Sequence, residues 1–258
     1  NFENGDQIGF TMTKVNGTEA YADNAALTFD GTVFSGDLKW YADAYSEADV
    51  YAYYPYNANG TPTAYFAVED QTDGIAKADL MAAVKKGVLP TPNAITMVFK
   101  HLMTKLVINI DNQSGAEVTG VEIGGCRLVT GLDISEMALT KYTDIVIEAE
   151  PLIKAYEATA GKVWQAIVIP DKAKLEIIVN LSNGKKITQP LAEMTLKSGG
   201  QYSINARLLQ DDMTVSASGE IENWTDEGEI GFEGEGTTEE IPVEFTEYDG
   251  YFVYDGVE

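Results

Sequence analysis

Residues suited to chemistry are scarce, because the sequence contains one histidine, His101, and one cysteine, Cys126. A serine or cysteine hydrolase needs a base beside its nucleophile, and the G-x-S-x-G motif is not found. Two soft ligands do not make a zinc site, and neither glycine-rich phosphate-binding motif occurs. We therefore predict no catalytic residue, no metal and no cofactor, and hence no enzyme. His101 lies in a strand-like run and is expected to be structural, and Cys126 to be a buried thiol.

Carboxylates are abundant, with 41 Asp and Glu against 17 Lys and Arg, and they leave two alternatives open. A glycoside hydrolase would need two facing carboxyl groups in a cleft, about 5–10 Å apart. Weak calcium binding would use carboxylate oxygens, although neither Asp70–Gly74 nor the GFEGEGTTEE stretch has the spacing of a calcium loop. The formal net charge of -24 argues against nucleic acid and anionic lipid as partners, because their phosphates would be repelled.

Four tyrosines gather in the segment YAYYPY, namely Tyr51, Tyr53, Tyr54 and Tyr56. Their rings could stack on sugars, which would make the chain a surface carbohydrate-binding module or accessory lectin. Rings at alternate strand positions also fill the core of a β-sandwich, and this is the interpretation we favour.

The elements that must position these residues are organised around the strand-like run FKHLMTKLVINI, residues Phe99–Ile110. From Leu102 onward the apolar side chains share one face, whereas Phe99 and Met97 lie on the opposite phase. Because a change of phase moves side chains to the other face of a sheet, we expect the strand to leave one core and enter another. The junction then lies at Phe99 and His101, between a first domain of residues 1–98 and a second of residues 99–230.

Short apolar pieces separated by Gly, Asn, Asp and Pro fill the first part, and the strands of the second part are longer and richer in Ile, Val and Leu. This pattern predicts an all-β fold of the sandwich type. Asp79–Gly87 could be either a short helix or an edge strand. Asn183-Gly184 predicts a type I′ hairpin, in which both turn residues adopt positive φ, and Pro190 should end the return strand or place it at an edge.

Residues 231–258 form an acidic, glycine-rich linker followed by strand-like sequence, and no Lys or Arg follows Arg207. Apolar Ile241, Val243 and Phe245 alternate with other residues, and a second short strand would contain Tyr251 and Val253. One interpretation is a terminal hairpin packed on its own domain. The other is a strand offered to another subunit, with these five residues as the candidate donor strand.

An ordered set of motifs resembles the fimbrillin-like, or minor-fimbrium-like, family of type V pilus subunits. The resemblance extends from Phe2 to Trp224 and leaves the acidic tail outside. Its elements are FENGDQIGF, Trp40, DVYAYYPY, Asp70-Gln71, Ala78–Met81, FKHLMTKLVINI, Ile169-Pro170, LKSGGQYSINARL and Ile221–Trp224.

The resemblance implies two tandem transthyretin-like β-sandwich domains with a C-terminal strand extension. It also implies a non-enzymatic cell-surface protein, a fimbrial subunit or adhesin, exported as a lipoprotein with a lipidated cysteine upstream of this sequence that anchors it to the outer membrane. Its partners would be other pilus subunits, joined by β-strand addition, and a host or bacterial surface receptor. Donation of the tail further predicts that aspartate at Val243 or Phe245 blocks assembly and leaves the monomer stable.

Overall fold

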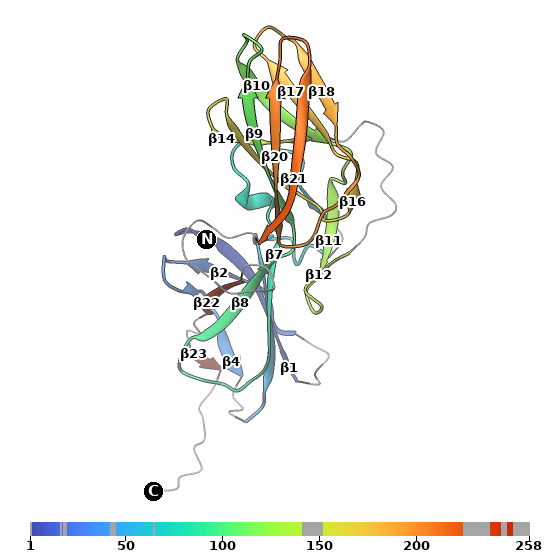
Figure 1. Cartoon of the computed structure of the whole chain (residues 1–258). Helices are drawn as coiled ribbons and strands as arrows, with labels where there is room; N and C mark the ends of the chain where they lie inside the picture. The colour runs from blue at the N-terminus through green and yellow to red at the C-terminus, as the bar shows by residue number, and fades with distance from the viewer. Residues whose placement is uncertain are drawn as a thin grey trace, which may run out of the picture.

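The chain folds into two lobes stacked end to end, with strands throughout (Figure 1). This computed structural model describes residues 2–15, 17, 20–41, 45–63, 65–140, 152–223, 238–243 and 247–249. Among them the only helical turn is the 3-10 helix η1 (Ala76–Ala78), which confirms the all-β class. The finer description as two tandem sandwiches stays a prediction. No helix in the described ranges is long and apolar enough to cross a membrane.

The first lobe is a ring of seven strands that closes on itself in the order β1-β2-β3-β22-β8-β7-β5. Six of the strands come from the first 101 residues, and the seventh, β22, comes from the C-terminal tail. The strands are β1 (Gln7–Lys14), β2 (Ala20–Phe29), β3 (Phe34–Ser35), β5 (Ala48–Tyr54), β7 (Met81–Val88), β8 (Ile95–His101) and β22 (Thr238–Val243). Large side chains of alternate residues fill the ring, among them Phe10, Phe34, Trp40 and Phe99.

The second lobe contains two larger sheets. A five-stranded sheet has the order β14-β15-β9-β20-β21, in which β9 and β20 run parallel at the centre. It is built from β14 (Tyr156–Thr159), β15 (Val163–Val168), β9 (Thr104–Asn112), β20 (Gly200–Leu208) and β21 (Met213–Asn223). A four-stranded sheet has the order β13-β10-β17-β18, from β13 (Ile153–Lys154), β10 (Val118–Gly124), β17 (Glu176–Leu181) and β18 (Lys186–Pro190).

Three small sheets complete the fold. The first links the two halves of the sequence, because β6 (Phe66–Ala67) pairs with β11 (Val129–Asp133), which also pairs with β12 (Ala138–Thr140). The others are β16 (Lys172–Ala173) with β19 (Met194–Thr195), and β4 (Lys39–Tyr41) with β23 (Glu247–Asp249). Through β6 and Val68, the segment between β5 and β7 packs on the second lobe, although it precedes Phe99 in the sequence.

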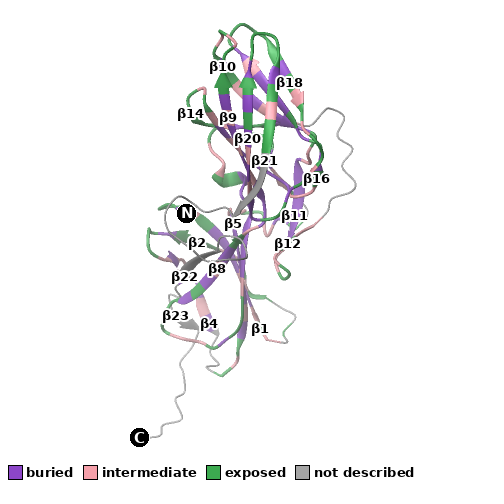
Figure 2. Cartoon of the chain, in the orientation of Figure 1, coloured by how far each residue is buried: buried purple, intermediate pink, exposed green. Residues whose placement is uncertain are grey.

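Buried residues form two clusters, one inside each lobe, as the purple strands of Figure 2 show. Met97 and Phe99 belong to the first cluster, and Leu102 and Leu106 belong to the second. The exchange of cores therefore occurs across the short break between β8 and β9, where the change of phase lies in the sequence.

Two local sequence patterns can be compared with the structure directly. Asp79–Gly87 is largely strand, because β7 covers Met81–Val88. The type I′ turn at Asn183-Gly184 is wrong, since φ is positive at Gly184 (81°) but not at Asn183. The amide of Leu181 donates to the carbonyl of Lys185, so the loop has three residues and needs a left-handed residue only at its end. Pro190 does end β18, an edge strand.

Candidate strand-exchange site in the first lobe

The C-terminal strand β22 fills the gap between β3 and β8 in the first lobe. It pairs antiparallel with β8, from Thr238 opposite Lys100 to Val243 opposite Ile95. At its end Val243 also pairs in parallel with Phe34 of β3. The tail therefore adds a strand to a sheet made by residues that lie far away in the sequence, which is the geometry of β-strand addition within one chain.

The edge that β22 covers belongs mainly to β8. On its other side β8 pairs with β7 only at its end, where His101 lies opposite Met81 and Lys100 opposite Ala82. The backbone of Ile95–Phe99 therefore finds most of its ladder partners in β22. An uncovered β8 would expose a row of backbone donors and acceptors ready to pair with another strand.

Val243 is completely buried in the core of the first lobe. The same core contains an aromatic group built around Phe2, whose ring centroid lies 5.0 Å from that of Phe34 and 5.2 Å from that of Phe99, with the rings packed edge to face. Edge-to-face packing is a favoured arrangement of aromatic rings. A strand that leaves this position would withdraw Val243 from one side of a well-packed core.

The structure places two of the five candidate donor residues. Ile241 and Val243 both lie in β22. Phe245, Tyr251 and Val253 lie outside the described residues. In this monomer the described part of the tail pairs with its own first lobe.

The candidate sugar-stacking tyrosines divide into two classes. Tyr53 and Tyr54 are buried, so their rings have no face open to a sugar, whereas Tyr51 and Tyr56 are half-buried. The Tyr53 hydroxyl donates to Asn24 Oδ1 at 2.6 Å, and burial raises the pKa of Tyr53 to about 12. The Tyr53 ring packs directly against Gly9, where the Cβ of any other residue would lie 2.2 Å from a ring carbon and would clash with it. Tyr54 donates to Asp6, and burial followed by the charge of Asp6 raises its pKa.

At the junction, His101 is held by a carboxylate from the preceding crossover. His101 Nδ1 lies 2.7 Å from Asp79 Oδ2, and both side chains are only 8% exposed. Next to it, the Ser198 hydroxyl of the second lobe donates to the carbonyl of Leu102 at 3.0 Å. Phe99, two residues earlier, is completely buried in the first lobe. These contacts give His101 a role in fixing the connection between the lobes, since a buried polar side chain is held in place by its hydrogen-bond partner.

A buried polar residue whose contacts the sequence did not reveal is Gln71, which is 2% exposed. Its side-chain amide donates to the carbonyl oxygens of Ile167 (2.7 Å) and Val68 (2.9 Å), and it accepts a hydrogen bond from the Ile167 amide (2.7 Å). The side chain thus behaves as a peptide group that continues the edge of β15 beyond β14. The neighbouring Asp70 forms an ion pair with Lys154 of β13 at 2.9 Å. Only the position of Gln71 within the Asp70-Gln71 motif could have signalled this contact.

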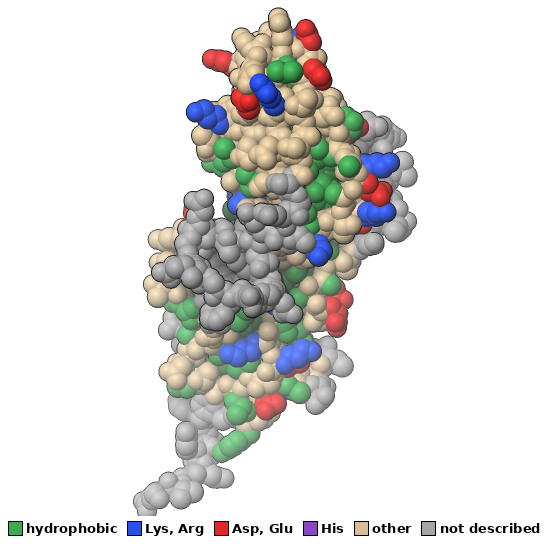
Figure 3. Space-filling model, in the orientation of Figure 1, with side chains coloured by type: hydrophobic (Ala, Val, Ile, Leu, Met, Phe, Trp, Pro, Cys, Tyr) green, Lys and Arg blue, Asp and Glu red, His purple; other side chains and the backbone are tan. Residues whose placement is uncertain are grey.

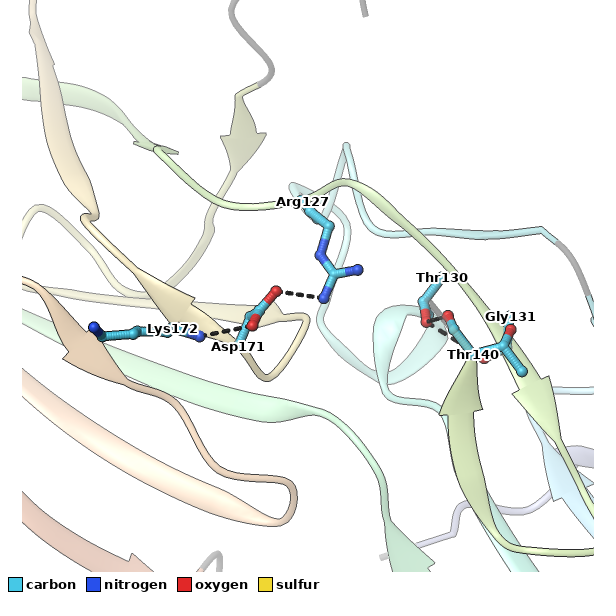
Figure 4. A network of polar contacts seen from close by, with 6 residues as sticks. All are labelled: Arg127, Thr130, Gly131, Thr140, Asp171 and Lys172. Atoms are coloured by element: carbon cyan, nitrogen blue, oxygen red, sulfur yellow. Dashed lines mark hydrogen bonds and ion pairs between the residues drawn. The ribbon is translucent and has the colours of Figure 1, made fainter. Parts of the chain in front are cut away.

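A further polar network contains Arg127, the residue that follows Cys126 in the sequence (Figure 4). Arg127 donates to Asp171 Oδ2 at 2.5 Å, and the backbone amide of Lys172 donates to the other oxygen of the same carboxylate at 2.8 Å. Nearby, the Thr130 hydroxyl donates to the carbonyl of Thr140. The network ties the chain before β11 to the loop before β16.

The one cysteine, Cys126, is half-buried in the structure. Burial raises the pKa of the Cys126 thiol to about 12, so little thiolate forms near neutral pH. Within the described part of the chain, no group of three or more His, Cys, Asp or Glu side chains could hold a metal ion.

Comparison with known proteins agrees with the architecture. No curated protein matches the sequence at a significant level. A solved candidate cell adhesion protein from Bacteroides ovatus ATCC 8483 is 22% identical, with a TM-score of 0.67 over 88% of this chain and 90% of that one. Another, from Bacteroides uniformis ATCC 8492, is 21% identical, with a TM-score of 0.65 over 87% and 93%. These structures share the fold.

The family of this chain follows from a family model that matches its sequence. The model of the fimbrillin-like family matches residues 1–224, which include both lobes up to the end of β21 and exclude the tail that carries β22. The chain therefore belongs to the fimbrillin-like family, a family of fimbrial structural subunits.

Proposed function

We propose that this cell-surface fimbrial protein associates with other pilus subunits by exchanging its C-terminal strand. In the monomer β22 covers β8 of its own chain, and in the assembly the equivalent strand of a neighbour would take that place. The observation that carries the proposal is the pairing of all six residues of β22 with β8, when β7 pairs with only two residues of β8. A strand from another subunit would satisfy the same backbone groups.

The connection of β22 to the rest of the chain supports exchange. Residues 224–237 join the end of β21 to the start of β22, and this segment contains four glycines and no Lys or Arg. Linkers of glycine-rich, like-charged composition impose little constraint on the distance between the segments that they join. A strand at the end of such a sequence could therefore reach either its own lobe or a neighbouring one. The proposal divides the chain into two β domains, residues 1–98 and 99–230, and an exchangeable extension, residues 231–258.

The remaining parts of the proposal follow from the family. A structural subunit needs no catalytic site, and we assign none. Outer-membrane anchoring through a lipidated cysteine that precedes this sequence, and contact with a receptor, complete the proposed cell-surface role. Labelling of the protein with a radioactive fatty acid in its own bacterium would test the anchor.

Strand exchange can be tested by locking β22 in place. Thr96 of β8 and Pro242 of β22 lie directly opposite each other. The Thr96 side chain is exposed, and the Pro242 side chain is half-buried. Directly opposed residues have Cβ atoms about 4.5–5.5 Å apart, which is close to disulfide geometry. The double variant T96C/P242C should form a disulfide under oxidation, and half-buried Cys126 competes little because its thiol pKa is raised.

The oxidised and reduced forms of the same variant are matched samples. We expect the reduced protein, held at high concentration, to form ladders on native gels and larger species in light scattering, and the oxidised protein to remain monomeric. Equal assembly of both forms, or no assembly of either, would contradict exchange of β22.

A further inference from the structure

The second lobe has an open polar groove on the outer face of its five-stranded sheet. The groove has a volume of 840 Å³ and crosses β15, β9, β20 and β21. This size lies within the range of small-ligand sites. Figure 1 shows β20 and β21 on the near side of this lobe, and Figure 3 shows the same face as largely uncharged, with isolated basic and acidic side chains.

The register of the strands brings the groove side chains into two rows. Val163, Asn109, Asn205 and Ser216 lie side by side across the four strands. Two residues further along β9, Asp111, Arg207 and Thr214 form the second row. Since residues two apart in a strand share a face, both rows point outward together.

Hydrogen bonds already hold several of these side chains in place. Asn109 Nδ2 donates to Asn205 Oδ1 at 3.0 Å, which leaves the Asn109 carbonyl and the Asn205 amino group for a ligand. Arg207 donates to Gln113 at 2.9 Å and lies 3.7 Å from Asp111, while Gln113 donates to Asp111 at 2.9 Å. A site whose polar groups are fixed in advance loses less freedom on binding.

The side chains suit a sugar that carries a carboxylate. Amides and hydroxyls spaced by neighbouring strands, about 4.8 Å apart, offer both donors and acceptors to ring hydroxyls. Half-buried Val163, in the same row as Asn109, offers apolar surface to the C–H side of a ring. The groove also has two cations, Lys162 and Arg207, against one acid, Asp111, in a chain whose net charge is -24. A guanidinium binds a carboxylate with two parallel hydrogen bonds.

We propose that this groove binds oligosaccharides that end in a carboxylated sugar, with Arg207 and Lys162 facing the carboxylate and Asn109 and Asn205 facing ring hydroxyls. The groove is remote from β22. Strand β9 starts at the junction with Thr104 and reaches Asp111 seven residues later, about 23 Å away at the usual rise of a strand. Ligand binding and strand exchange therefore use separate surfaces, and each can fail without the other.

The test uses the full chain in its oxidised T96C/P242C form, so that assembly does not interfere. Amide resonances of the ¹⁵N-labelled protein are followed during titration with 3′-sialyllactose, with a hyaluronan disaccharide, and with lactose, which has no carboxylate. We expect shifts confined to residues of the groove, and an affinity for at least one acidic sugar that is tenfold or more above that for lactose.

Variants then assign the contacts. R207A should weaken binding of the acidic sugar at least tenfold and leave the weak binding of lactose unchanged, whereas N205A should weaken both. K172A removes one positive charge from an exposed position of the same lobe outside the groove, and should change neither. Absence of shifts with both acidic sugars, equal affinity for lactose, or unchanged binding in R207A would overturn the proposal. Unchanged thermal midpoints show that the variants are folded.

Discussion

Val243 and Phe34 lie side by side in parallel register, and both side chains are completely buried. One residue belongs to the last part of the chain and the other to its first strands, so the core of the first lobe is completed only when the tail has returned to it. The stability of this lobe is therefore coupled to the occupancy of the gap between β3 and β8, whichever chain supplies the strand.

Shortening Val243 tests whether β22 contributes to this core. V243A should lower the free energy of unfolding by about 2 kcal/mol, because two buried methyl groups are lost and a small cavity remains. V33A is the matched control, since Val33 is only half-buried and should cost less than about 1 kcal/mol. Urea unfolding of both variants measures the difference. Equal losses would mean that β22 is not part of the core.

The same burial changes the expectation for aspartate at this position. From the sequence, V243D should block assembly and leave the monomer stable. With Val243 in the core, V243D should instead destabilise the first lobe, because burying a carboxylate is costly. Assembly of this variant therefore has to be compared with that of the disulfide-locked protein, whose core is intact.

Local patterns in the sequence predicted what depends on local physics. The alternation of apolar and polar residues predicted the strands. The change of phase before Leu102 predicted where the chain passes from one core to the other. The alternation of Ile241 and Val243 likewise indicated a strand. Its partners β3 and β8 could not be predicted, because strand pairing over such a distance depends on the whole topology and not on local spacing.

The buried and cross-strand polar contacts could not be predicted from the sequence for a related reason. Gln71, Asp79 and Asn205 lie within motifs of the resemblance, but nothing in their immediate neighbours indicates which residues they contact. Their roles arise from the crossover before β7 and from the register of β9 with β20, which place each of them against residues far away.

Substitutions at Gln71 test whether its side-chain amide is needed to pair with the backbone of Ile167. Q71A should cost about 3 kcal/mol, because the Ile167 amide and carbonyl lose a buried partner. In Q71E a carboxylate would face two carbonyl oxygens, so burial and repulsion should raise its folded pKa above the unfolded value of about 4.3. Its stability should be greatest below about pH 4 and should fall as the pH rises through the folded pKa.

Urea unfolding between pH 3 and pH 8 measures this dependence, with Q210E as the control. Gln210 is exposed, so the new carboxylate there should keep an ordinary pKa and add little dependence on pH. A Q71E protein with the same pH profile as Q210E would show that the Gln71 amide does not require its donors.

The buried contact of His101 with Asp79 should stabilise the junction. D79N removes the charge but keeps the shape of the side chain and an acceptor oxygen. It should cost about 1 kcal/mol, because a hydrogen bond to a charged group becomes a weaker neutral one. D73N makes the same change at an exposed position of the same crossover and should have little effect. Thermal unfolding followed by the assigned indole ¹⁵N–¹H resonances of Trp40 in the first lobe and Trp164 in the second would show where stability is lost. Equal midpoints for the two variants would contradict a structural role of the pair.

The ion pair of Asp70 with Lys154 gives a prediction for acidic pH. The hydrogen bond from Lys154, assisted by Thr72, lowers the pKa of Asp70 to about 2, below the unfolded value of about 3.9. A group whose folded pKa is lowered stabilises the protein above the unfolded pKa, and this contribution is lost as the pH falls from about 4 to about 2. We expect the ¹³C resonance of the Asp70 carboxyl to titrate near pH 2, and in K154M to titrate higher. An unchanged midpoint in K154M would show that Lys154 is not the cause of the lowered pKa.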